Sequence, residues 1–310
     1  MKYYLISWCL GNFPKIEIDS ERYLALQDAR NILIGALAIE EKYDLLFSNY
    51  LELEKDCLNY ATECMVKGSL GYDEIIKARQ SINRRLVNLL TSTRLYTDHI
   101  QQNIKLCIAK DSNFKVKKLM AKQYDENFSY RFMEALRNYV QHCGLAIHYF
   151  SAPTRWTSQD NSGELEFRIN FFSKKEILKE SGNFKALVLQ EMPDSVDVIR
   201  ASRSYVSSIS TVHSEIRATV KLSVNNARKL LESAIGEYKS VNGGLADGLR
   251  AIKSEKEDFY KDDIVDYFPI LLEWDNSRVE LEDKNRLVHN LEERFVSSST
   301  YNKALHLKNR

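Results

Sequence analysis

The stretch 39-IEEKYDLLFSNYLELEKDCLNYATEC-64 places an apolar or aromatic residue at alternating steps of three and four. This spacing follows the 3.6-residue turn of an α-helix and gathers the apolar side chains on one face. The repeat occupies Ile39, Tyr43, Leu46, Tyr50, Leu53, Cys57, Tyr60 and Cys64. It predicts a long amphipathic helix that ends near the glycine-containing sequence KGSLG at 67–71.

The same helical spacing recurs on both sides of this stretch. It predicts a second long helix over 72–108 and a further helix over 128–150, separated by the basic segment 114–123. Beyond Pro193 another long helix is expected to run to the NGG sequence at 242–244. Only 4 prolines and 11 glycines interrupt 310 residues. The predicted class is mainly α, with an antiparallel helical bundle over 28–150.

A smaller β element is expected after Phe150. Residues 154–173 alternate polar and apolar side chains on either side of DNSG at 160–163, which predicts a β-hairpin. The N-terminal segments 2–10 and 15–18 are expected to be strands that could extend it. The charged remainder after NGG is expected to be helical, interrupted only at FPILLEW, residues 268–274.

These patterns divide the chain into four ranges. Residues 1–24 form an N-terminal strand segment and 25–150 a helical domain. Residues 151–193 form the hairpin and a connector, and 194–310 a C-terminal helical region. We found no internal repeat.

Composition gives no sign of a membrane-spanning protein, a disulfide-rich secreted protein or a protein with a strong overall charge. The net charge of +1 gives no global attraction to nucleic acid or to an anionic membrane. Five cysteines without a CxxC pair are typical of free thiols in a reducing compartment. The longest apolar run, 32–39, is far shorter than the roughly 18 residues of a membrane span. We therefore expect a cytoplasmic protein with no membrane partner, no cofactor and no metal site.

The helix expected over 128–150 carries the polar residues of most interest, within 131-RFMEALRNYVQHCGLAIH-148. A helical wheel places seven residues on its core face: Phe132, Leu136, Tyr139, Val140, Cys143, Ile147 and Phe150. Arg137 and His142 fall on the two edges of the opposite, polar face, about 140° apart. Leu145 lies in the middle of that polar face, which suggests that the face packs against a second copy of the chain.

The sequence 137-RNYVQH-142 resembles the RxxxxH signature of the HEPN superfamily, in which a polar residue often follows the arginine. The resemblance covers about 25–150 and implies a helical bundle of HEPN type. It also implies a metal-independent endoribonuclease that leaves a 2′,3′-cyclic phosphate, with Arg137 and His142 catalytic and Asn138 supporting. The implied partners are an RNA substrate, a second copy in a homodimer, and an inhibitory antitoxin or regulatory protein. A toxin or antiviral-defence role is implied as well.

The residue types suit that chemistry. Histidine titrates near neutral pH and can transfer a proton, while arginine stays charged and can hold a phosphate through its planar fork of donors. Four lysines before the motif helix, Lys115, Lys117, Lys118 and Lys122, could track an RNA backbone or form a solvated face. Segment 104–150 holds 8 basic and 4 acidic residues, whereas 245–310 holds 11 and 14.

The RxxxxH spelling occurs a second time, as 94-RLYTDH-99. Arg94, Asp98 and His99 could support the first motif from the neighbouring helix. Arg94 and Asp98 could equally form a surface ion pair, because they are four residues apart on a helix. A non-catalytic HEPN-like module that binds a nucleotide, RNA or a protein partner is the alternative function, and a purely structural helical scaffold is the third.

Overall fold

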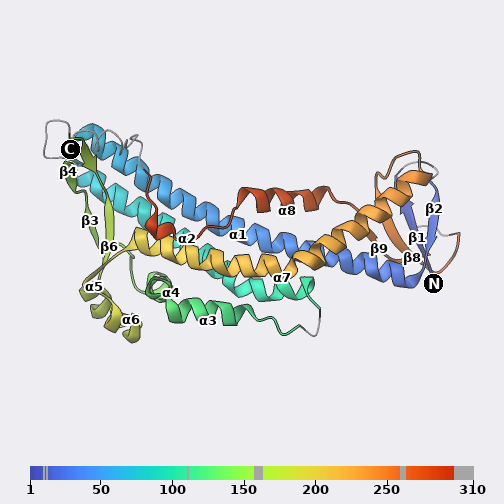
Figure 1. Ribbon diagram of the computed structural model, residues 1–310, viewed down its shortest axis with the longest axis horizontal. Coiled ribbons are helices and arrows are strands. Elements are labelled where there is room, and N and C mark those ends of the chain that lie inside the picture. The colour runs from blue at the N-terminus through green and yellow to red at the C-terminus, as the bar shows by residue number, and fades with distance from the viewer. Residues whose placement is uncertain (10, 12, 110–111, 157–162, 259–262, 297–310) are drawn as a thin grey trace, which may run out of the picture. The chain divides into compact units, whose positions relative to one another are not determined.

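The computed structural model describes residues 1–9, 11, 13–109, 112–156, 163–258 and 263–296. Three long helices dominate the described residues: α1 (Ser20–Lys67), α2 (Tyr72–Cys107) and α7 (Val198–Val241) (Figure 1). The shorter helices are α3 (Val116–Glu126), α4 (Phe128–His142), α5 (Lys175–Glu180), α6 (Ala186–Glu191), α8 (Glu273–Lys284) and a 3₁₀ turn, η2 (Leu291–Glu293). The predicted mainly α class is confirmed.

The long helices form because their apolar stripes are buried as the spacing predicts. On α2 six residues at alternating steps of four and three are at most 1% exposed: Ile82, Leu86, Leu89, Thr93, Tyr96 and Ile100. On α1 the expected stripe is buried except at Cys57 and Tyr60, which are partly exposed. Gly68 ends α1 with φ +79, a backbone conformation that favours glycine. The Glu74 carboxylate then accepts the Gly71 N–H at 2.8 Å and caps α2.

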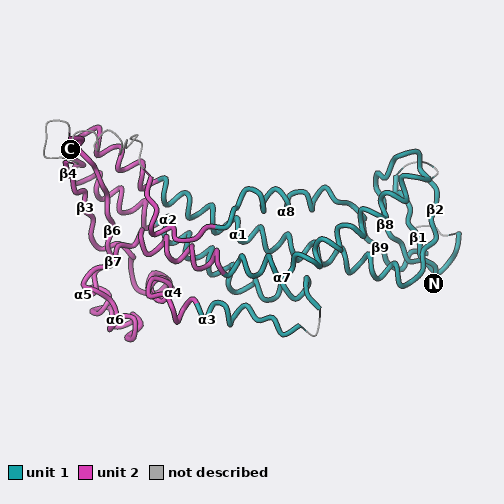
Figure 2. The backbone as a smooth tube through the Cα atoms, viewed as in Figure 1, with its two compact units in different colours: residues 1–55, 84–122, 212–287 teal, residues 56–83, 123–211, 288–310 magenta. Residues whose placement is uncertain are grey.

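The chain divides into two compact units that are discontinuous in sequence (Figure 2). Unit 1 contains residues 1–55, 84–122 and 212–287, and unit 2 contains 56–83, 123–211 and 288–310. Each long helix therefore contributes residues to both units. The four ranges proposed from the sequence stay a prediction about domain organisation.

Unit 1 contains a four-stranded antiparallel sheet in the order β2-β1-β8-β9. Its strands are β1 (Lys2–Ser7), β2 (Lys15–Ile18), β8 (Leu249–Ser254) and β9 (Ile264–Pro269). The two N-terminal strands are confirmed, but β1 pairs with β8 and not with the 154–173 hairpin. The expectation that the chain after NGG is helical up to 268 is wrong, because pairing with β1 places β8 and then β9 in this sheet.

One face of this sheet packs against the beginning of α1 and the end of α7. The Tyr23 ring of α1 lies 5.0 Å from Tyr3 and 5.2 Å from Phe268, measured between ring centroids. The Tyr23 hydroxyl donates to the Asp266 carboxylate at 2.9 Å. On α7, the Tyr238 hydroxyl accepts the Ser7 N–H at 2.8 Å. Aromatic packing with satisfied hydroxyl groups thus joins the sheet to the helices of unit 1.

Unit 2 contains two small antiparallel sheets. The first has the order β3-β6-β7, formed by β3 (Tyr149–Ser151), β6 (Asn170–Lys174) and β7 (Ser195–Asp197). The second pairs β4 (Thr154–Trp156) with β5 (Leu165–Phe167). The predicted antiparallel pairing across DNSG is confirmed for β4 and β5. Residues 170–173, which the sequence pattern assigns to the same hairpin, belong to β6 instead and pair with β3 and β7. Residues 160–162 of that predicted turn lie outside the described residues.

Candidate functional site

Helix α4, in unit 2, carries the RNYVQH motif, and its N-terminus is fixed by Asn127. The Asn127 side chain accepts the Tyr130 N–H at 3.2 Å, which caps the helix. The same side chain donates from Nδ2 to Ser204 Oγ at 2.9 Å and to Ser208 Oγ at 3.2 Å on α7. One asparagine therefore sets both where α4 begins and how it lies on α7.

Four of the seven residues predicted for the core face are buried: Phe132, Leu136 and Tyr139 on α4, and Ile147 beyond its end. Val140 and Phe150 are partly exposed. The helix ends at His142, however, so the expectation that it continues to 150 is wrong. Cys143 is consequently exposed, and Leu145 lies beyond the helix with 54% of its surface exposed. Leu145 is not part of a polar helix face.

A side chain from α2 helps to explain where α4 stops. Asn83 Oδ1 accepts the N–H groups of both Ala146 and Ile147, each at 3.1 Å. These bonds satisfy two backbone donors that a continued helix would have used internally. Gly144 is a weak helix former at the same point. The chain leaves α4 here and enters β3 at Tyr149.

Arg137 is held against α4 itself. Its side chain is only 12% exposed, and its Nη2 lies 3.7 Å from Glu134 Oε2. Its Nη1 donates to Gln141 Oε1 over a long 3.5 Å. The buried Nε atom has no hydrogen-bond partner among the described residues. The guanidinium group is therefore largely enclosed but poorly hydrogen-bonded.

Glu134 is in turn held by α7. The hydroxyl of Tyr205, which is fully buried, donates to Glu134 Oε1. Burial, and then the charge of Glu134, raise the pKa of Tyr205 well above its ordinary value of 10.0, so this hydroxyl stays protonated and remains a donor. Tyr205 thus fixes one oxygen of the carboxylate, while the other oxygen faces Arg137.

The other two candidate catalytic residues lie in solvent. Asn138 and His142 are both exposed, and His142 belongs to the last turn of α4. Arg137 and His142 are five residues apart, which separates them by about 140° around the helix. Among the described residues, no hydrogen bond or ion pair joins these two side chains. Within one chain the structure does not bring them together.

The other sequence-predicted residues lie in unit 1. Arg94 and Asp98 form an exposed ion pair with a nitrogen–oxygen distance of 2.6 Å. Of the two interpretations given to these residues, support for the first motif or a surface ion pair, the structure shows the ion pair. His99 is exposed beside them. The four candidate RNA-binding lysines are exposed at the start of α3 and along it: Lys115, Lys117, Lys118 and Lys122.

A buried polar cluster in unit 1 was missed by the sequence analysis. Glu40 of α1, 2% exposed, accepts two hydrogen bonds from Arg217 of α7, at 2.9 and 2.6 Å. His213, fully buried, lies 3.4 Å from Glu40 and 3.0 Å from the Tyr96 hydroxyl. The signal that could have found the cluster is a glutamate next to the apolar stripe of α1, with histidine and arginine four residues apart on α7.

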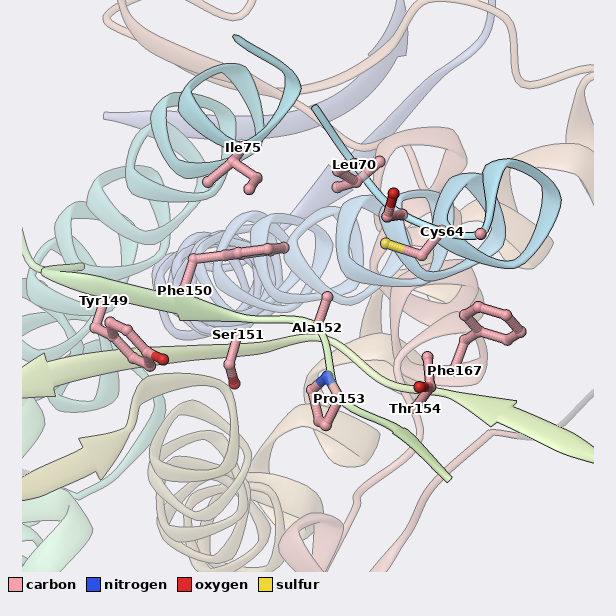
Figure 3. Close-up of a pocket in the computed structure, with 12 residues that line it drawn as sticks. Cys64, Leu70, Ile75, Tyr149, Phe150, Ser151, Ala152, Pro153, Thr154 and Phe167 are labelled. Atoms are coloured by element: carbon pink, nitrogen blue, oxygen red, sulfur yellow. The ribbon is translucent and has the colours of Figure 1, made fainter. Parts of the chain in front are cut away.

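Unit 2 also contains a pocket of about 430 Å³ between the α1–α2 turn and the β3–β4 segment (Figure 3). Phe150 and Ala152 point toward the helical turn, whereas Tyr149 and Ser151 point to the other face of the strand. Ile75, Leu70 and Cys64 close the helical side, together with other residues of that turn. The lining is mainly apolar, and none of the motif residues belongs to it.

No protein-family model, curated protein or solved structure matches this chain. Within the described residues, no group of three or more histidine, cysteine, aspartate or glutamate side chains is placed to hold a metal ion. No described helix is both long and apolar enough to cross a membrane. The functional assignment therefore depends on the residues and contacts of α4.

Proposed function

We propose that this protein is a metal-independent endoribonuclease of HEPN type, with its reaction centre on α4. The observation that carries the proposal is the division of α4 into two faces. Phe132, Leu136 and Tyr139 are buried in unit 2, while Asn138 and His142 stand in solvent at the end of the helix. Asn138 and His142 are therefore not needed to fill the core.

The chemistry follows from the side chains. The 2′-hydroxyl of a ribose gives up its proton and attacks the adjacent phosphate, which forms a 2′,3′-cyclic phosphate. The bond from phosphorus to the 5′-oxygen of the next nucleotide breaks, and that oxygen takes up a proton and leaves as a 5′-hydroxyl. His142 transfers a proton in this step, and Arg137 stabilises the negative charge on the phosphate in the transition state. Asn138 orients the phosphate or the imidazole. Cleavage of this kind requires RNA, because DNA has no 2′-hydroxyl.

The proposal includes a homodimer. Two copies of α4 placed around a two-fold axis supply two arginines and two histidines to one groove, which one helix cannot do across 140°. The exposed apolar side chain of Leu145, beside the end of α4, is available to such an interface. Mixing the Arg137→Ala and His142→Ala proteins should then restore part of the activity. Active monomers in sedimentation would exclude the dimer.

The proposed reaction is tested by incubating purified protein with total RNA, with and without a chelator. Cleavage should survive the chelator and should disappear in Arg137→Ala and in His142→Ala, with the circular-dichroism spectrum unchanged. The second RxxxxH match provides a control of identical chemistry. Arg94→Ala and His99→Ala should cleave RNA like the wild type. Full activity of either α4 variant would reject the motif.

One observation favours the alternative, a non-catalytic HEPN-like module. Arg137 is enclosed and faces a carboxylate, so it is not open to a phosphate in the described conformation. A module of this kind would bind RNA, a nucleotide or a partner protein through the exposed part of α4. The same incubation separates the two functions, because the alternative gives binding without cleavage. A role in growth arrest or antiviral defence, controlled by an inhibitory partner, belongs to the first function only.

A further inference from the structure

We propose that Glu134 is a built-in competitor for phosphate at Arg137, held in place by Tyr205. The inference rests on the proposed function, since it takes Arg137 as the group that meets phosphate. It adds a regulatory element to that site: the free chain keeps Arg137 occupied by its own carboxylate, and a phosphate has to displace that carboxylate before it can bind.

The first ground is how poorly Glu134 satisfies Arg137. An arginine offers five N–H donors, and a well-placed carboxylate takes two of them at about 2.7–2.9 Å. Here the nearest approach between the two groups is 3.7 Å. Because Nε is buried without a partner among the described residues, the guanidinium retains unused donor capacity. A phosphate could form shorter and stronger bonds than Glu134 does.

The second ground is that Glu134 cannot move closer to improve the pair. Tyr205 is fully buried on α7, and its hydroxyl donates to the Oε1 atom of Glu134. The carboxylate is thereby fixed between a neutral donor and the guanidinium. The carboxylate lies 3.7 Å from the guanidinium group, so its charge acts on any anion that approaches Arg137. Because only 22% of the Glu134 side chain is exposed, solvent screens this repulsion weakly.

The geometry therefore distinguishes a competitor from a support. A residue that positions an arginine for catalysis is expected to hold it through short, directed hydrogen bonds. Glu134 instead gives Arg137 a long contact and places a negative charge where the negative charge of a phosphate would have to come. Removing the charge while keeping the shape should therefore strengthen anion binding at Arg137.

The test compares Glu134→Gln with wild type in a titration with inorganic phosphate. Glutamine keeps the size of the side chain and an oxygen acceptor for Tyr205. The readout is the Nε–H resonance of Arg137 in ¹⁵N-labelled protein, assigned by its loss in Arg137→Lys. We expect phosphate to bind about tenfold more tightly to Glu134→Gln, equivalent to about 1.4 kcal/mol. Equal or weaker binding would overturn the inference.

The matched control is Glu191→Gln. Glu191 of α6 pairs with Arg131, on the same helix as Arg137, at 2.6 Å. Removing its charge should change phosphate binding at Arg137 by less than about twofold. A gain as large as that of Glu134→Gln would mean that general charge causes the effect, and would also overturn the inference. If Glu134→Gln does not fold, Tyr205→Phe serves instead, because it frees the carboxylate to approach Arg137. We then expect phosphate to bind about threefold more weakly than to wild type, and unchanged or tighter binding would overturn the inference.

A second titration separates this inference from the proposed function. The probe is a short RNA with 2′-O-methyl groups, which can bind but cannot be cleaved by a 2′-hydroxyl attack. Tighter phosphate binding by Glu134→Gln, with no binding of this RNA and no cleavage of total RNA, would uphold the competitor and reject the ribonuclease. Cleavage by the wild type with unchanged phosphate affinity in Glu134→Gln would reject the competitor and uphold the ribonuclease.

Discussion

Each unit contains a glutamate–arginine pair beside a buried aromatic hydroxyl, and the two pairs differ in how well they are satisfied. In unit 1, Arg217 donates to both oxygens of Glu40 at 2.9 and 2.6 Å. In unit 2, Arg137 approaches Glu134 no closer than 3.7 Å. A buried ion pair that uses both oxygens of its carboxylate has little left for a ligand. A loosely paired arginine still has that capacity.

The two pairs differ in where their partners come from. Glu40 and Arg217 come from different helices, so their side chains can meet end to end in the two-bond geometry that suits carboxylate and guanidinium groups. Glu134 and Arg137 are three residues apart on one helix. This spacing does not itself prevent a forked hydrogen bond, since Arg278 donates to both oxygens of Asp275, also three residues earlier, at 2.7 and 3.0 Å. The long contact between Arg137 and Glu134 is accompanied by a second partner, Tyr205, whose hydroxyl holds the other oxygen of Glu134.

The largest expected effect is the loss of the unit 1 carboxylate. Glu40→Ala should lower the free energy of unfolding by about 3–5 kcal/mol, because it leaves Arg217 as an uncompensated charge in the interior. Glu134→Ala should lower it by only about 1–2 kcal/mol, mainly because the buried Tyr205 hydroxyl loses its acceptor. Urea unfolding followed by circular dichroism measures both. Equal losses would remove the distinction between the two pairs.

The second effect is an acid-dependent loss of stability in unit 1. Burial alone would raise the pKa of Glu40, but hydrogen bonds from His213 and Arg217 lower it from 4.5 to about 2. The unfolded chain therefore takes up this proton first, and the stabilisation present above pH 4.5 is lost as the pH falls toward 2. The loss is on the order of 3 kcal/mol. Urea unfolding of wild type and Glu40→Gln across this range measures it, and the variant should lack this step.

His213 adds a milder step at higher pH. Burial lowers its pKa below 6.5, although Glu40 opposes the shift, so the folded chain binds this proton less readily than the unfolded chain. Stability should therefore begin to fall as the pH drops below about 6.5. His148 in unit 2 has a pKa that burial lowers in the same direction. The difference between wild type and His213→Gln isolates the unit 1 contribution, and identical curves for the two proteins would contradict it.

Exchanging arginine for lysine should give a smaller effect. Arg217→Lys keeps the charge but loses the forked pair with Glu40, and should cost on the order of 2 kcal/mol. Arg137→Lys loses only long contacts and should cost less than about 0.5 kcal/mol. Thermal unfolding of the two variants under one buffer condition measures the contrast. A costly Arg137→Lys would show that Arg137 is structural after all.

The sequence predicts the long helices well because the information is local. The apolar spacing on α1, α2 and α7 depends on residues within a few turns of one another, and burial follows it closely. The strands β8 and β9 are different. They lie in a part of the chain that is rich in charged residues and has no clear strand pattern. The segment of β8 forms a strand because it pairs with β1, more than 240 residues earlier in the chain.

The site shows the same limit on a smaller scale. That Asn138 and His142 share an exposed region follows from helical spacing alone. The end of α4 at His142 does not, because it involves Asn83 on another helix. The position of the carboxylate that faces Arg137 also escapes prediction, since Tyr205 holds Glu134 from α7. Contacts between segments far apart in the sequence decide which motif residues are accessible to solvent and which are held by other side chains.

The smallest effect on stability is expected for the lysines of α3, which extend the comparison to fully exposed charges. The structure records no ion pair for Lys115, Lys117 or Lys118 with any described residue, so replacing all three with alanine should change stability by no more than about 0.5 kcal/mol per site.

The effect of replacing these three lysines should appear in RNA binding instead. Each phosphate contact contributes about 0.7 to the slope of log affinity against log salt for a single strand, so losing three contacts should flatten the slope by roughly 2. Fluorescence anisotropy with a labelled RNA at several salt concentrations measures this slope, with Lys229→Ala, on the exposed surface of α7, as a control of equal charge per site. An unchanged slope would assign these lysines to a solvated face and remove them from the RNA-binding surface.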